Sequence, residues 1–181
     1  MKIGFMGSAG TGKTTLMNAC LKHPIFDEYS AQLSIARTVA AYDLPVNDKA
    51  TPYSQLLLTV ARCNMDLTNL NKNLISDRTP LDSLAYTMYS RASIWEHTIA
   101  SGFYWEQSYT LVQHCMKAYD LLVYFPIFWK VVADDVRIDD PVYQKEIDTN
   151  MKIIVNDMGL KVYPIINGNI QQRVHWLADM I

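Results

Sequence analysis

The sequence predicts an α/β protein with a three-layer, doubly wound parallel sheet of five strands. Segments patterned as strands alternate with segments patterned as helices along the chain, which favours a parallel sheet with helices on both faces. Several expected strands are near-continuous apolar runs, as is typical of strands buried on both faces. The first strand also leads directly into a glycine-rich loop and a helix, and right-handed crossovers would set the hand of the sheet.

The composition predicts one globular domain over residues 1–181. Half of the residues are hydrophobic and 19% are charged, which allows a sizeable core. The net charge of −2 argues against a large nucleic-acid footprint, which usually carries a basic excess. Cys20, Cys63 and Cys115 are scattered, as expected of reduced thiols in the cytoplasm. The chain shows no apolar run of membrane-spanning length, no signal peptide and no zinc-type histidine spacing.

Residues 2–6 form a short apolar run that predicts a buried first strand. Residues 7–14, GSAGTGKT, then fit G-x-x-x-x-G-K-[ST] at every fixed position, and residues 16–21 can continue as a helix. Glycines let such a loop wrap closely, so that its N–H groups and the helix N-terminus face an anion. Lys13 can reach the β- and γ-phosphates of a triphosphate, and the Thr14 hydroxyl can hold Mg²⁺. The expected triphosphate contacts are Gly7, Ala9, Gly10, Thr11, Gly12, Lys13, Thr14 and Thr15.

Residues 24–29 place two apolar residues before two carboxylates, and we interpret them as the second strand. Ligands bind at the carboxyl ends of parallel strands, so Glu28 would face the site. The alternative is an acid at a helix start or on the solvated surface. Residues 30–41 are patterned as a helix that carries Arg37, and residues 44–48 form a turn.

Thr51 and Pro52 begin the next helix, as an N-cap residue followed by proline at the first position. Gln55 and Arg62 fall off its apolar stripe or at the edge of it. They are therefore free to bind a ligand, or are simply solvated. The residues of the stripe recur at helical spacing and are Tyr53, Leu56, Leu57, Val60, Cys63, Leu67 and Leu70.

Residues 73–77 predict the third strand, which ends at Asp77 and Arg78. Thr79 and Asp82 then fit a capping box, with a proline in the first helical turn. At a strand end beside the phosphate loop, Asp77 can organise the metal and Arg78 can offer a phosphate its bidentate fork. The alternative is an Asp–Arg pair on the surface.

The second half continues the alternation. Residues 86–109 are rich in aromatics, which fill cores more often than they stack on nucleobases. A helix over 104–118 precedes the fourth strand at 119–126. The charged segment that follows carries Arg137, which is either a lid over the donor phosphates or an exposed charge among acids. The remaining elements are a helix from Asp140-Pro141 to Gly159, an edge strand over 161–166 that contains Pro164, and a closing helix over 169–181.

These features together fit phosphoryl transfer, which depends on positioning and charge neutralisation around the γ-phosphoryl group. Lys13, Arg78 and Arg137, with Mg²⁺, would supply positive charge from different sides. Glu28 could take a proton from an acceptor hydroxyl or orient that hydroxyl.

Three segments carry a resemblance to a known family: GSAGTGKT, DRTPLDSLAY at 77–86 and DDVR at 134–137. Together they resemble the P-loop nucleoside and nucleotide kinases, especially small AAA-type ATPases that are thymidylate-kinase-like or ribosylnicotinamide-kinase-like, many of them from bacteriophages. The resemblance covers nearly the whole chain. It implies the P-loop NTPase kinase fold with strand order 2-3-1-4-5, ATP with Mg²⁺, acceptor-binding helices at about 45–118 and a short lid at about 130–140.

By this resemblance, Asp77 matches the metal-organising acid and Arg78 the arginine that holds substrate or phosphate. Arg137 matches a lid arginine, and Glu28 an acid after strand two that contacts the acceptor. One departure is the lid, which is usually arginine-dense in deoxynucleoside kinases but here offers Arg137 and little else.

The second departure lies after the expected second strand. A thymidylate kinase usually has a basic residue there for the acceptor phosphate, whereas this chain has Asp27 and Glu28. A free hydroxyl is therefore a plausible acceptor, although Arg37 or Arg62 could still hold a phosphate.

The leading hypothesis is an ATP-dependent kinase that transfers the γ-phosphoryl group to a (deoxy)nucleoside or nucleotide-type acceptor. The alternatives within the class are a phage kinase for 5-hydroxymethyluracil in DNA, with DNA as substrate, and a ribosylnicotinamide kinase. An alternative from another class is a regulatory P-loop NTPase. The protein would be a cytoplasmic monomer or homodimer.

Overall fold

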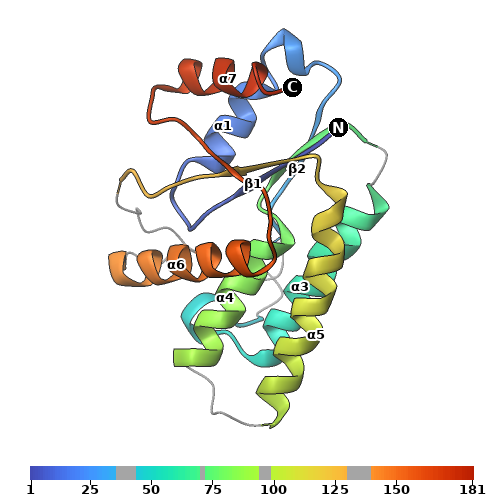
Figure 1. Cartoon of the computed structure of the whole chain (residues 1–181), viewed down its shortest axis with the longest axis vertical. Coiled ribbons are helices and arrows are strands. Elements are labelled where there is room, and N and C mark those ends of the chain that lie inside the picture. Colours follow the sequence, from blue (N-terminus) through green and yellow to red (C-terminus); the bar gives the residue numbers. More distant parts are fainter. Residues whose placement is uncertain (36–43, 70–71, 94–98, 130–139) are drawn as a thin grey trace.

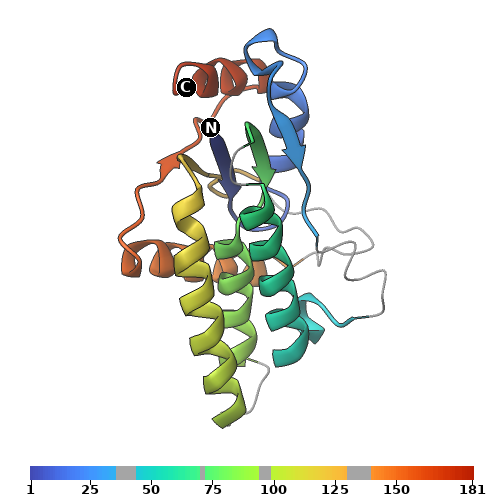
Figure 2. The ribbon, with the colours of Figure 1, turned by 90° about the vertical axis from the view of Figure 1, so that its right-hand side faces the viewer.

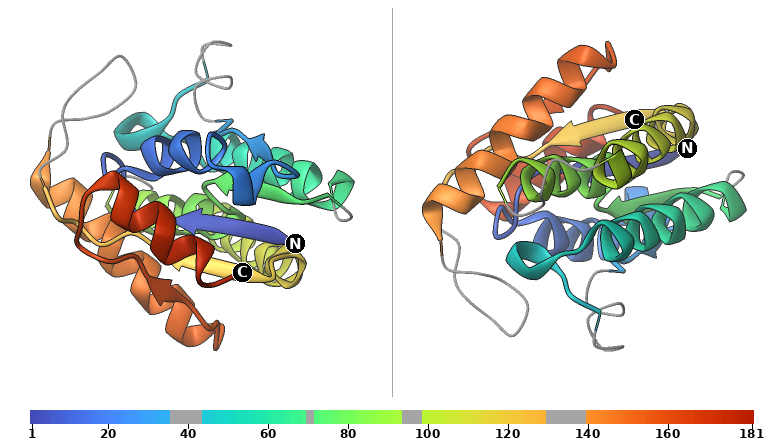
Figure 3. Two further views of the ribbon diagram at one scale, coloured as in Figure 1. Left: turned by 90° about the horizontal axis from the view of Figure 1, so that it is seen from above. Right: turned by 90° about the horizontal axis from the view of Figure 1, so that it is seen from below.

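The computed structural model describes residues 1–35, 44–69, 72–93, 99–129 and 140–181. Within these ranges the chain forms one sheet of five parallel strands in the order β2-β3-β1-β4-β5. This confirms the predicted fold class and strand order, and Figure 3 shows β1 in the middle of the sheet. The strands are β1 (Lys2–Met6), β2 (Ser30–Gln32), β3 (Leu74–Asp77), β4 (Leu121–Tyr124) and β5 (Tyr163–Pro164).

Helices cover both faces of the sheet and create the three expected layers (Figure 1). On one face lie α1 and α7, and on the other lie α3, α4, α5 and α6. Side chains alternate along β1, so Phe5 enters the hydrophobic cluster under α1 and α7, while Met6 enters the cluster of the other face. The helices are α1 (Lys13–Cys20), η1 (Pro24–Phe26), η2 (Asn47–Lys49), α3 (Pro52–Thr68), α4 (Pro80–Ser93), α5 (Ile99–Cys115), η3 (Met116–Ala118), α6 (Pro141–Asp157) and α7 (Ile170–Ala178).

Capping residues mark the helix starts that the sequence predicts. The Thr51 hydroxyl accepts from the backbone N–H of Ser54, and Pro52 occupies the first helical turn. Asp140 caps α6 in the same way, with a carboxylate oxygen 2.8 Å from the nitrogen of Val142. Each cap satisfies N–H groups that would otherwise lack a partner at the start of the helix.

The prediction of the second strand is wrong. Pro24–Phe26 form the 3₁₀ helix η1, because Pro24 suits a first helical position and the His23 side chain accepts from the N–H two residues on. The strand that pairs with β3 is instead Ser30–Gln32, where a helix was expected. Glu28 therefore precedes β2 and is exposed at the amino end of the strand, not at its carboxyl end.

Helix α3 packs beside α4 and α5 with its polar side inward (Figure 2). Gln55 and Arg62 are each 2% exposed, so the alternative that they are simply solvated is wrong. Three members of the predicted apolar stripe face solvent instead: Tyr53, Val60 and Leu67, which are 62%, 45% and 41% exposed. The inward side chains have hydrogen-bonding partners or a cavity to face, and these constraints outweigh the hydrophobic pattern of the helix.

No helix among the described residues has both the length and the apolar character needed to cross a membrane.

The inverted orientation of α3 predicts an unequal response to two leucine substitutions. Leu67→Gln should change the free energy of unfolding by no more than about 0.5 kcal/mol, because the side chain already meets water. Leu84→Ala on α4, where the side chain is 0% exposed, should cost roughly 2–5 kcal/mol. Urea unfolding of both variants measures the difference, and equal losses would contradict the orientation of α3.

Candidate active site

The phosphate loop links the end of β1 to the start of α1 and depends on two of its glycines. Gly7 has φ +148°, and a Cβ there would lie 2.7 Å from the carbonyl oxygen of Phe125. Gly12 caps α1 with φ +89°, a left-handed conformation that glycine adopts without steric cost. The path of the chain therefore excludes a side chain at position 7 and favours glycine at position 12.

Lys13 lies across the loop and is 5% exposed. Its ammonium donates to the carbonyls of Gly7 and Ser8, at 2.7 and 2.6 Å, and to the Thr11 hydroxyl at 3.1 Å. The cation is thus held at the rim of the loop, where the phosphates of a bound nucleotide would meet it.

Thr14 and Asp77 meet at the edge of the sheet. The Thr14 hydroxyl donates to a carboxylate oxygen of Asp77 at 2.5 Å, and Asp77 is 6% exposed. Hard oxygen donors of this kind suit Mg²⁺, which keeps several waters and also binds substrate phosphates. No cluster of three or more His, Cys, Asp or Glu within the described ranges could hold a metal by itself. The Thr14–Asp77 pair therefore fits an Mg²⁺ ion that arrives with a nucleotide.

A cavity of about 350 Å³ opens beside the loop. Its far wall contains Trp129, whose indole N–H donates to the carbonyl of Gly10 at 2.8 Å. Arg173 of α7 stacks on this ring and on Phe128, with its guanidinium carbon 5.0 and 5.1 Å from the ring centroids. The cavity is lined by Gly10, Thr11, Gly12, Lys13, Thr14, Thr15, Ser34, Asp77, Arg78, Trp129, Gly168, Ile170 and Arg173.

Arg173 is 3% exposed, and burial lowers its pKa. Its Nε and Nη2 atoms have no hydrogen-bond partner among the described residues. These two atoms form one side of the guanidinium fork, so a ligand in this cavity could accept both hydrogens. Sequence reasoning missed Trp129 and Arg173, because they come from distant segments and belong to no local motif.

A second cavity lies on the other side of Arg78, between α3, α4 and α6. Gln55 and Arg62 both line it, and neither the Gln55 Oε1 nor the Arg62 Nε has a partner within the described part of the chain. The aromatic walls of this cavity are Tyr86, the first residue of the aromatic segment noted in the sequence, and Tyr143, which sequence reasoning missed. The lining residues are Ala9, Ser34, Ile35, Val46, Asn47, Gln55, Leu58, Arg62, Arg78, Thr79, Asp82, Ser83, Tyr86, Tyr143, Gln144 and Ile147.

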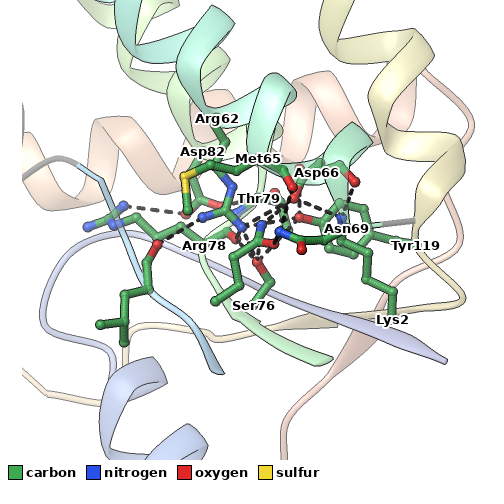
Figure 4. A network of polar contacts seen from close by, with 12 residues as sticks. Lys2, Arg62, Met65, Asp66, Asn69, Ser76, Arg78, Thr79, Asp82 and Tyr119 are labelled. Atoms are coloured by element: carbon green, nitrogen blue, oxygen red, sulfur yellow. Dashed lines mark hydrogen bonds and ion pairs between the residues drawn. The ribbon is translucent and has the colours of Figure 1, made fainter. Parts of the chain in front are cut away.

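Arg78 lines both cavities. Figure 4 shows it beside Asp82 in a network of polar contacts. Its guanidinium is 3.4 Å from a carboxylate oxygen of Asp82 and lies over the Tyr86 ring at 5.4 Å. Burial alone would lower the pKa of Arg78. Tyr86 and the nearby carboxylates together raise it by a larger amount, so the pKa lies above its usual value. The arginine therefore stays charged, and with 22% of its side chain exposed it can reach a ligand.

Asp82 joins the start of α4 to the phosphate loop. One carboxylate oxygen accepts from the Thr79 N–H at 2.8 Å and from its hydroxyl at 3.1 Å, the pairing that the sequence predicts. The other oxygen accepts from the Gly7 N–H at 3.3 Å and from Arg78. A single carboxylate thus aligns the first glycine of the loop with the arginine between the cavities.

One candidate from the sequence, Glu28, does not join this site in the structure, and two others lie outside the described residues. Glu28 lies at the opposite end of β2, because the strand begins after it. Arg37 and Arg137, with the lid expected at about 130–140, fall outside the described residues. The carboxyl end of β2 brings Ser34 to both cavities instead.

Three features define a P-loop nucleotide-binding protein: the parallel sheet, the glycine loop with its lysine, and the Thr14–Asp77 pair. The comparison with protein families agrees: the AAA domain family matches residues 2–173. The chain therefore belongs to the AAA domain family. A search of curated proteins found no match.

Solved structures share the fold at low sequence identity. Deoxyadenosine kinase from M. mycoides with bound dCTP is 13% identical, with a TM-score of 0.72 over 99% of this chain and 98% of that chain. A NadR protein in complex with NR is 18% identical, with a TM-score of 0.73. The match covers 98% of this chain but 49% of the NadR chain, so this protein spans about half the length of that relative. These likenesses confirm the P-loop kinase fold.

The position of Trp129 predicts a fluorescence signal for nucleotide binding. Its ring lies against Gly12 and its N–H is bonded to Gly10, so a nucleotide in the loop should change its surroundings. Titration of the protein with MgATP should shift the tryptophan emission until the site is saturated. Trp129→Phe should remove most of the shift while calorimetry still detects binding. An equal shift in this variant would show that another tryptophan reports the event.

Proposed function

We propose that the protein is an ATP-dependent kinase that phosphorylates a (deoxy)nucleoside or nucleotide-type acceptor. The observation that carries this proposal is the place of Arg78, which lines both the cavity of the phosphate loop and the cavity between α3, α4 and α6. A donor phosphate in the first cavity and an acceptor in the second would share this cation. ATP binding or hydrolysis alone does not require the second cavity, whereas transfer to an acceptor does.

The chemistry follows from the charges around the loop. An acceptor oxygen, from a nucleoside hydroxyl or a nucleotide phosphate, attacks the γ-phosphorus, the bond to the β-γ bridging oxygen breaks, and ADP leaves. The proton of an acceptor hydroxyl is released to water. Lys13 and Arg78 neutralise charge on the transferred group from two sides, which is the main contribution of protein to such a transition state. Thr14 and Asp77 would hold Mg²⁺, which when bound adds its own positive charge to the phosphates.

Glu28 has no role in this proposal, because its position at the far end of β2 removes it as the base. Phosphoryl transfer through a loose transition state needs little help from a base, so alignment of the acceptor is the larger requirement. The side chains that could provide this alignment are those of the second cavity.

The second cavity suits the edge of a nucleobase. Gln55 Oε1 accepts a hydrogen and Arg62 Nε donates one, and both are buried without partners among the described residues. A base edge with one donor and one acceptor would satisfy both atoms, and Tyr86 and Tyr143 offer it aromatic walls. This combination supports the earlier assignment of Gln55 and Arg62 to substrate binding.

A ribosylnicotinamide acceptor is the second candidate. The NadR structure whose fold matches this chain is described as a complex with NR, and the nicotinamide amide also presents one donor and one acceptor. The same two residues could therefore face either acceptor.

A transfer panel tests the proposal directly. ATP labelled at the γ-position is offered with nucleosides, deoxynucleoside monophosphates, ribosylnicotinamide and DNA that contains 5-hydroxymethyluracil. We expect label on one small-molecule acceptor far faster than its release to water. Label on the DNA would show that the acceptor is a base within DNA and not a small molecule. If none of these acceptors changes the rate of ATP turnover, the kinase proposal is wrong and a regulatory NTPase is favoured.

Lys13→Ala should reduce transfer by at least about 100-fold, because the γ-phosphoryl group loses a fixed positive charge. Lys145→Ala is the matched control, since Lys145 is exposed on α6 away from both cavities. Initial rates at saturating ATP measure the effect. Full activity of the Lys13→Ala variant would show that Lys13 of the phosphate loop takes no part in the reaction.

Gln55→Leu should raise the KM of the acceptor roughly 10-fold, the value of one hydrogen bond to a neutral group, and should leave the KM of ATP unchanged. Gln113→Leu, on the exposed side of α5, provides the comparison. If the acceptor KM is the same in both variants, Gln55 does not contact the acceptor.

A further inference from the structure

Arg78 has a backbone conformation that its residue type disfavours. Its φ angle is +85°, in the left-handed region, where a residue other than glycine costs of order 1–3 kcal/mol. This conformation places its side chain in the wall that both cavities share. Surrounding contacts must hold the backbone there.

Those contacts converge on the Arg78 carbonyl (Figure 4). It accepts from Nη2 of Arg62 at 2.6 Å and from the Ser76 hydroxyl at 3.0 Å. Nη1 of Arg62 donates to the carbonyl of Leu33 at 3.3 Å. One guanidinium therefore ties together the backbone segments that leave β2 and β3.

Arg62 is itself fixed by a buried network behind the site. Asp66 lies one turn further along α3, 3.6 Å from the Arg62 guanidinium, and is 0% exposed. Asp66 also pairs with Lys2 at 2.9 Å and accepts from the Tyr119 hydroxyl at 2.9 Å. Gln32 of β2 donates to the same carboxylate. The network thus reaches three neighbouring strands of the sheet and the segment that precedes β4.

Stability alone does not explain this network. Replacement of a buried ion pair by apolar side chains of similar volume is often neutral, or stabilising by about 1–4 kcal/mol. Apolar side chains could not reproduce the hydrogen bonds to the carbonyls of Leu33 and of Arg78, the residue with the strained backbone.

We propose that Arg62 and Ser76 are positioning residues that hold Arg78 in its left-handed conformation, and thereby fix its guanidinium between donor and acceptor. The inference rests on the proposed kinase function. Arg62 acts here through Nη1 and Nη2, whereas the acceptor contact suggested above uses Nε. Ser76 lines neither cavity, so its effect on turnover can pass only through its neighbours.

Ser76→Ala tests the proposal in a double-mutant cycle with Arg78→Ala. In the wild-type background it should lower kcat about 10-fold, because small displacements of a catalytic group cost up to about 100-fold. In the Arg78→Ala background it should change kcat less than about 2-fold, since no guanidinium remains to be positioned. The KM of ATP should stay the same. Equal factors in the two backgrounds would overturn the proposal.

Thr87→Ala is the matched control, because Thr87 is also buried and also donates to a backbone carbonyl, that of Ser83 at 2.9 Å. It should lower the urea midpoint about as much as Ser76→Ala and should leave kcat within about 2-fold of wild type. A loss of kcat like that of Ser76→Ala would overturn the proposal, because general destabilisation would then explain both.

A crystal structure of Arg62→Met gives a readout that needs no enzyme activity. The φ angle of Arg78 should leave the positive region once the guanidinium is gone. If φ stays near its present value, Arg62 does not hold it and the proposal fails. If the wild-type protein phosphorylates none of the acceptors, the proposed function fails instead, and this structural test still decides the role of Arg62.

Discussion

The pairing of β1 with β3 is the constraint on which the site depends. Their register sets Phe5 opposite Asp77, so the phosphate loop and the Asp77–Arg78 segment leave the sheet side by side. A shift of one residue would turn these side chains to the other face of the sheet and separate Thr14 from Asp77. The buried Lys2–Asp66 pair joins the start of β1 to α3.

Three of the cations around the site each face a carboxylate or backbone carbonyls. Lys13 rests on loop carbonyls, Arg78 on Asp82, and Arg62 on Asp66. Each cation is therefore desolvated only where a negative group or carbonyl faces it, which limits the cost of burial. Arg173 differs, because it has aromatic rings in place of an anion and two N–H groups without partners among the described residues.

Residues that lie in a local pattern could be predicted from the sequence, and residues brought in by tertiary packing could not. The loop, Asp77 with Arg78, and the Thr79–Asp82 cap all follow from short-range rules of turns and helix starts. The second strand is only three residues long, which is too short for a periodic signal. The predicted strand was therefore placed at residues 24–29, and Glu28 was wrongly put at its carboxyl end. For α3 the hydrophobic pattern predicted the wrong buried side. The side of this helix that faces inward is polar, because it meets buried hydroxyl groups and one of the cavities. Trp129 and Arg173 come from segments more than forty residues apart, and no local rule connects them.

The two cavities draw their walls from different parts of the chain. The cavity beside the phosphate loop is built mainly on that loop, α1 and the start of α7, and the second cavity on α3, α4 and α6, with Arg78 and Ser34 in common. Substitutions at positions of α3 and α6 that contact neither Arg78 nor the phosphate loop can therefore reshape the second cavity without disturbing the first. Under the proposed kinase function, a lineage with this architecture is free in evolutionary terms to exchange acceptors while it keeps its phosphate donor.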